Sequence, residues 1–114
     1  MDYEKYLTDN EKEGVKAFVD KVKQLLGPSL IKLRIFGSKV RGDFDMESDI
    51  DILLVVESED WHVRGEIINI VAEVNLEYSC NISPVIYTSR EHEMNKYYKT
   101  LFVQEVEREG VPLA

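Results

Sequence analysis

Hydrophobic residues recur on one helical face over the first part of the chain. Thr8 followed by Glu11 is the capping-box pattern that opens a helix. The apolar positions behind it keep helical spacing: Val15, Phe18, Val19, Val22, Leu25 and Leu26. Gly27 and Pro28 then end the pattern, so we predict a helix that begins after Thr8 and ends before Gly27.

Two stretches that follow alternate between apolar and polar positions, as strands do. Residues 30–36 place three apolar side chains opposite Lys32 and Arg34, which predicts a strand with one solvated face: Ile31, Leu33 and Ile35. Residues 49–56 predict a second strand, with Ile50, Ile52, Leu54 and Val56 on one face and Asp49, Asp51, Leu53 and Val55 on the other. Residues 37–48 join them and are long enough for one helical turn.

The second half of the chain repeats the alternation of helix and strand. Asp60 is placed to cap a helix that ends near Tyr78, with an apolar stripe of Val63, Ile67, Ile70, Val71 and Val74. Residues 82–87 predict a short strand, and Pro84 indicates an edge position or an irregular start. Thr88 and Glu91 form a second capping box, which opens one last helix carrying Met94, Tyr97, Tyr98, Leu101, Phe102 and Val106 up to Gly110. Helices interleaved with few strands predict an α/β or α+β fold in which helices cover a small sheet.

Composition narrows the class of protein. The 114 residues contain no repeat or linker, so we expect a single domain over residues 1–114. The net charge of −8 argues against direct nucleic-acid binding, which depends on Lys and Arg. No apolar run approaches the roughly 20 residues of a membrane span, and the first residues are too acidic for a targeting signal, so we expect a cytoplasmic protein with no membrane partner.

The stretch between the first two strands carries the candidate chemistry. Gly37 follows a strand directly and permits a tight turn, and Ser38 is placed to cap the helical turn after it, where N–H groups favour phosphate. Lys39 and Arg41 add positive charge, and which of them points inward is open. A Gly-Ser pair alone is more often an ordinary turn.

Asp49 and Asp51 lie two apart on a strand, so their carboxylates share a face about 6.5 Å apart. Such a pair repels unless a cation lies between its members, and oxygen ligands suit Mg²⁺ completed by substrate phosphates. An Asp-x-Asp pair by itself is most often a solvated strand end. Gly-Ser, ten residues and Asp-x-Asp together arise by chance in about one chain in a thousand of this length.

This combination resembles the signature of the DNA polymerase beta-like nucleotidyltransferase superfamily, and in particular its minimal (MNT) domains. The resemblance extends to residues 33–38 (LRIFGS), Arg41 and Gly42 in the spacer, Ser48 before the acidic pair, and residues 107–113 (EREGVPL). It implies a nucleotidyltransferase fold with a small mixed β-sheet covered by helices. It also implies two sets of site residues: Gly37, Ser38, Lys39, Arg41 and Ser48 for ATP, and Asp49 and Asp51 for catalysis and Mg²⁺.

The resemblance also implies a partner. MNT domains are typically encoded beside a HEPN-domain ribonuclease toxin and act as its antitoxin, and some transfer AMP from ATP to a tyrosine of that toxin. A hetero-oligomer is therefore expected. One alternative is a module with a decayed site that neutralises its partner by binding alone. Another is an antibiotic-modifying adenylyltransferase, for which 114 residues leave no room for an acceptor domain.

The chain departs from the superfamily pattern at one position. A third carboxylate often lies on the next core strand, whereas residues 82–88 (ISPVIYT) contain no acid, and Ser83 or Val85 takes its place. Weaker metal binding and poorer activation of the acceptor hydroxyl follow from that loss.

The remaining reactive or aromatic side chains have simpler interpretations. His62 and His92 are expected on the solvated surface and Cys80 in packing. Tyr97, Tyr98, Leu101 and Phe102 exceed one helical face, so part of this group is expected to contact a partner.

Overall fold

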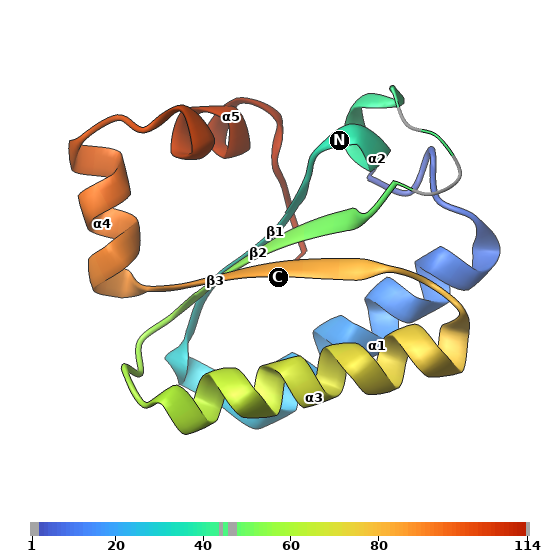
Figure 1. The fold of residues 1–114 in the computed structure, drawn as a ribbon, viewed down its shortest axis with the longest axis horizontal. Helices are drawn as coiled ribbons and strands as arrows, with labels where there is room; N and C mark the ends of the chain where they lie inside the picture. The colour runs from blue at the N-terminus through green and yellow to red at the C-terminus, as the bar shows by residue number, and fades with distance from the viewer. Residues whose placement is uncertain (1–2, 44, 46–47, 114) are drawn as a thin grey trace.

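The chain folds around one mixed sheet, which confirms the expected α/β class (Figure 1). The computed structural model describes residues 3–43, 45 and 48–113. Within them the strands are β1 (Leu30–Phe36), β2 (Ile50–Val56), β3 (Ile82–Thr88) and β4 (Val111–Pro112), in the order β3-β2-β1-β4. β1 is antiparallel to β2 and β4, whereas β2 and β3 are parallel. The short β4, which the sequence did not predict, pairs with Arg34 and Ile35 of β1.

Two long helices cover one face of this sheet, as the helical spacing predicts. They are α1 (Asp9–Leu26) and α3 (Trp61–Tyr78), which lie side by side in Figure 1. The Thr8–Glu11 capping box starts α1, Asp60 caps α3, and a 3₁₀ turn, η1 (Gly27–Ser29), follows α1. The buried side chains of this layer and the sheet form the main core: Val15, Phe18, Val22, Ile50, Ile52, Leu54, Ile67 and Val74. None of the described helices is long and apolar enough to span a membrane.

The last part of the chain forms two helices, so the prediction of one continuous helix is wrong. α4 (Ser89–Tyr97) ends before α5 (Leu101–Glu109) begins. Between them Lys99 adopts a left-handed φ of 49°, and the Thr100 hydroxyl oxygen accepts from the Val103 N–H at 3.3 Å, which caps α5. Apolar residues keep a helical spacing across the break, so the sequence pattern did not reveal it. The chain changes direction there, which brings α5 against the end of β1.

These two helices partly cover the second face of the sheet (Figure 1). The Phe102 ring meets the rings of Phe36 and Tyr87 edge-on, with centroids 5.4 and 5.8 Å apart. This face is therefore less solvated than the alternation in β1 indicated. Ile31, expected in the core, is 47% exposed because the pairing of β1 with β2 shifts register between Leu30 and Lys32.

The two histidines differ in their surroundings. His62 is exposed, as expected, with Nδ1 2.9 Å from Asp60. The surface position expected for His92 is wrong: this residue is 4% exposed, because α4 packs it towards β1, where its Nε2 lies 3.2 Å from Lys32 Nζ. A lysine ammonium has no acceptor, so the His92 ring accepts this bond in its neutral form. Cys80 packs against the main core, as expected.

Acidification is expected to reduce the stability of the fold through His92. Burial, together with the charges of Lys32 and Lys96, lowers the pKa of His92 from its ordinary 6.5, against the opposing effect of Glu93 and Glu107. As the pH falls, the unfolded chain therefore takes up the proton before the folded protein does. The free energy of unfolding is then expected to decrease below about pH 6.5, by at most about 1.4 kcal/mol per pH unit. Urea unfolding at a series of pH values measures this loss. An unchanged pH dependence in His92→Gln contradicts it.

Several backbone groups of the edge strand β3 are missing or already bonded, and so cannot pair with a further strand. Pro84 has no N–H, and the Asn75 side chain bonds both the N–H and the carbonyl of Ile82. Arg64 donates to the Ile86 carbonyl, and Glu91 accepts from the Thr88 N–H. Edges protected in this way resist strand addition, so a partner is expected to dock elsewhere.

Candidate functional site

Gly37 brings the end of β1 into contact with the second acid of the Asp-x-Asp pair. It joins β1 to the one-turn helix α2 (Ser38–Arg41) with φ 87° and ψ −163°, a conformation essentially restricted to glycine. A Cβ atom built on Gly37 would collide with the Asp51 carboxylate. Ser38 was expected to cap the helical turn, but Gly37 is the N-cap of α2 and Ser38 is its first helical residue.

The acidic pair lies at the start of β2. Asp49 comes just before the strand, is exposed, and its Oδ1 accepts from Asn81 Nδ2. Asp51 is half-buried between Phe36 of β1 and Ser83 of β3, its partners across the sheet. Burial, followed by the negative charge of Asp49, raises the pKa of Asp51. The two carboxylates therefore interact unfavourably in the absence of a cation, as the sequence pattern predicts.

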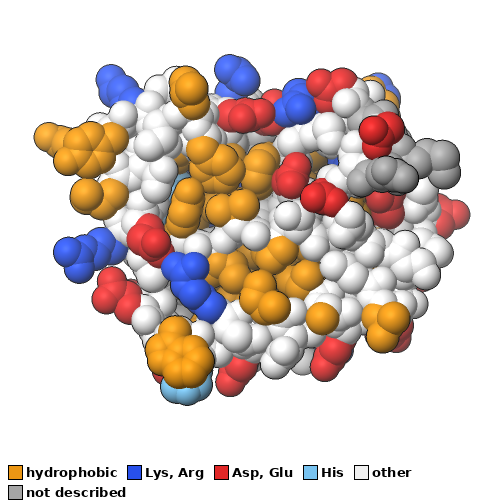
Figure 2. Space-filling model, viewed as in Figure 1, with side chains coloured by type: hydrophobic (Ala, Val, Ile, Leu, Met, Phe, Trp, Pro, Cys, Tyr) orange, Lys and Arg blue, Asp and Glu red, His pale blue; other side chains and the backbone are white. Residues whose placement is uncertain are grey.

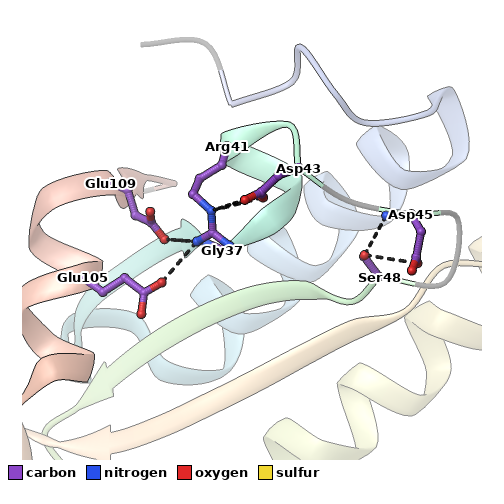
Figure 3. A network of polar contacts seen from close by, with 7 residues as sticks. All are labelled: Gly37, Arg41, Asp43, Asp45, Ser48, Glu105 and Glu109. Atoms are coloured by element: carbon purple, nitrogen blue, oxygen red, sulfur yellow. Dashed lines mark hydrogen bonds and ion pairs between the residues drawn. The ribbon is translucent and has the colours of Figure 1, made fainter.

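Arg41 is the cation of this region, and three carboxylates surround it (Figure 3). Its Nε lies 3.1 Å from both oxygens of Asp43, and its Nη1 lies 3.1 Å from Glu105 Oε1 and 2.7 Å from Glu109 Oε1. Glu109 Oε1 also accepts from the Gly37 N–H at 3.3 Å. The Arg41 charge opposes the rise in the pKa of Asp51, whereas Glu105 and Glu109 add to it.

Sequence reasoning missed Asp43, Glu105 and Glu109. Glu105 and Glu109 are four residues apart on α5 and so share one helical face, which was a readable signal. The direction of that face depends on the break before Thr100.

Lys39 and Ser48 are placed differently from Arg41. The Lys39 ammonium is buried and lies 3.0 Å from Glu11 of α1, the helix on the other face of the sheet from Asp51. Lys39 and Arg41 are two apart on a helix and thus point in different directions, so the structure brings only Arg41 to the acidic region. Ser48, the residue before Asp49, accepts from the Asp45 N–H through its Oγ at 3.0 Å (Figure 3).

Ser83 is the β3 residue that lies next to the acidic pair. It pairs with Asp51, whereas Val85 pairs with Leu53, one step further from the site. No group of three or more acidic, His or Cys side chains with metal-binding geometry is present in the described residues. The donors that are present, two mutually repelling carboxylates beside a half-buried strand end, fit a hard cation such as Mg²⁺ that keeps open positions for phosphate oxygens.

Comparison with known proteins assigns the chain to the kind of family that its sequence motif resembles. Residues 15–109 match the family described as "Nucleotidyltransferase domain". Two proteins of Methanocaldococcus jannaschii, both named "Putative protein adenylyltransferase", are 38% and 33% identical to the chain; they align over 87% and 89% of it and over 94% and 95% of their own lengths. A solved structure described as "Crystal structure of the toxin-antitoxin with AMP-PNP" shares the fold, with a TM-score of 0.53, 20% identity, and coverage of 85% of this chain and 70% of that one. The chain, with its Gly-Ser turn and Asp-x-Asp strand, belongs to the nucleotidyltransferase domain family.

Proposed function

We propose that this protein is a Mg-ATP-dependent nucleotidyltransferase that transfers AMP to a tyrosine hydroxyl of a HEPN-type partner and acts as its antitoxin. The observation that carries the proposal is the convergence of Gly37, Arg41 and Asp51 at one end of the sheet. The names of its relatives, protein adenylyltransferases, and the toxin-antitoxin complex that shares its fold support the same reaction and partner class.

Each residue of the site has a separate role in this reaction. The Gly37 N–H and the Arg41 guanidinium are donors for phosphate oxygens. Asp49 and Asp51 would hold Mg²⁺, and the bound ion would supply positive charge to neutralise the phosphates. The acceptor oxygen forms a bond to the α-phosphorus while the bond from that phosphorus to the bridging oxygen breaks, and pyrophosphate leaves. Ser83 beside Asp51 supplies no carboxylate, so the hydroxyl proton goes to solvent or to a base of the partner.

The proposed docking surface is the corner where α4 meets α5. Four apolar side chains are largely exposed at this corner: Met94 (51%), Tyr97 (78%), Tyr98 (67%) and Leu101 (85%). By contrast, Phe102 packs against the second face of the sheet. Figure 2 shows hydrophobic side chains projecting at this end of the molecule. An exposed apolar group of this kind marks a protein contact. Because the edge of β3 is protected against strand addition, this corner is a better docking surface for the partner than that edge.

A binding-only antitoxin is the second candidate function. It is favoured by Ser83 at the position beside Asp51 where a third carboxylate is absent. The two candidates differ in whether AMP reaches the partner, since docking and chemistry use different residues.

One experiment separates these functions. The protein is co-expressed with the product of the gene beside its own, and the purified complex is incubated with Mg²⁺ and ATP labelled at the α-phosphate. We expect a stable complex at micromolar concentration and label on a partner tyrosine. A complex without label supports the binding-only module, and separate elution with and without ATP contradicts both.

Asp49→Asn with Asp51→Asn is the control for the chemistry in this experiment. Because the exposed corner lies on other elements, the variant is expected to keep the complex and lose the label.

A further inference from the structure

Glu109 occupies the donors that the proposed phosphate site requires. Its Oε1 is 3.3 Å from the Gly37 nitrogen and 2.7 Å from Arg41 Nη1, so one carboxylate oxygen bridges the turn after β1 and the guanidinium (Figure 3). The side chain is 12% exposed, against 43% for Glu105, which contacts only the guanidinium side of this arrangement. Glu109 is thus the carboxylate that lies inside the site.

A carboxylate and a phosphate oxygen compete for the same donors. Both are anionic acceptors, and charge-assisted bonds to guanidinium and backbone N–H are the strong contacts of either. Three carboxylates already contact Arg41, so an incoming triphosphate meets negative charge as well as occupied donors. Phosphate binding through the Gly37 N–H and the side of Arg41 Nη1 that Glu109 holds therefore requires that Glu109 be displaced.

We propose that Glu109 is an internal latch, a carboxylate that takes the place of a nucleotide phosphate in the nucleotide-free protein and is released when Mg-ATP binds. This inference rests on the proposed function and adds its regulation. Glu109 is the last residue of α5, and Leu101 of the exposed corner is the first. Release of the latch removes a contact that holds the end of α5 against the turn after β1, and the other end of α5 belongs to the proposed docking surface, so nucleotide and partner are coupled through this helix.

The alternative role for Glu109 is that of the missing third carboxylate, turned towards Mg²⁺. The two roles predict opposite effects of removing its charge. A latch opposes nucleotide, so its loss tightens binding, whereas a metal ligand supports nucleotide, so its loss weakens binding.

The test compares three variants by calorimetry with a non-hydrolysable ATP analogue and Mg²⁺. Glu109→Gln removes the charge, and Glu109→Asp keeps it on a side chain too short to span both donors. Glu107→Gln is the matched control. Glu107 is exposed and lies on the same helix, but because it is two residues from Glu109 its side chain points in a different direction. Thermal unfolding without nucleotide is measured in parallel.

We expect Glu109→Gln to bind the analogue about threefold to tenfold more tightly and to unfold at a lower temperature. Glu109→Asp should show a smaller gain, and Glu107→Gln should change affinity by less than about twofold. Weaker binding by Glu109→Gln, unchanged binding, or an equal gain in Glu107→Gln overturns the latch while leaving the proposed function in place. Absence of binding by both the native protein and Glu109→Gln overturns the proposed function, and the latch with it.

Discussion

Neutralising the acidic pair, with Asp49→Asn and Asp51→Asn together, is expected to weaken Mg-dependent nucleotide binding by at least about a hundredfold and to abolish transfer. The reason is that a hard cation is held by charged oxygen ligands, and the amides supply neither the charge nor the second oxygen. Asn81 still has an acceptor at position 49, so the local geometry is retained. Calorimetry with Mg-ATP measures the loss.

The same double substitution is expected to leave the fold intact and to raise its melting temperature by a few degrees. Asp51 is half-buried next to Asp49, and both circumstances raise its pKa, so its charged form is unfavourable in the folded protein without a cation. By linkage, a carboxyl whose pKa is raised on folding destabilises the fold at neutral pH and ceases to do so as the pH falls through that pKa. The gain is therefore expected at pH 7 and should vanish in acid.

A control for the acidic pair removes the same charge elsewhere. Asp20→Asn with Glu73→Gln neutralises two exposed acids on α1 and α3. Nucleotide affinity in this control should match that of the native protein. If the Asp49 and Asp51 variant also kept its Mg-ATP affinity, the assignment of the metal site would be wrong.

Gly37→Ala is expected to abolish nucleotide binding and to destabilise the protein by about 1–3 kcal/mol. Two effects combine at this position. The backbone angles are strained for any residue with a side chain, and the added Cβ displaces the Asp51 carboxylate and so disrupts the proposed metal ligands. Urea unfolding and calorimetry on the same preparation separate the loss of stability from the loss of binding.

Gly27→Ala is the matched control for this glycine. Gly27 also has a positive φ, 52°, but a Cβ there meets nothing within 4 Å. It should cost comparable stability through backbone strain and leave nucleotide affinity unchanged. Gly37→Ala with native affinity, in a folded protein, would show that the turn is structural only.

Much of the fold was predictable because its signals are local. The capping boxes at Thr8 and Thr88 act within one turn of their own helices, and both are formed. The alternation in β2 sorted Ile52 and Leu54 from Leu53 and Val55, since a strand turns successive side chains to opposite faces. The family and the acidic pair were likewise readable, because the motif is short and its spacing is fixed along the chain.

Tertiary structure decided what depends on residues far apart in the chain. Lys39 pairs with Glu11, a direction that the sequence had left open, and His92 pairs with Lys32 instead of lying on the surface as expected. The break before Thr100 is local, but its consequence, α5 lying against β1, is not.

The contact of Glu109 with Gly37 and Arg41 spans 72 and 68 residues. The sequence by itself determined the family, most of the elements, and the two acids of the proposed site. The tertiary structure alone decided which charges face that site, because a side chain pairs with whatever the packing of helices on the sheet brings within reach.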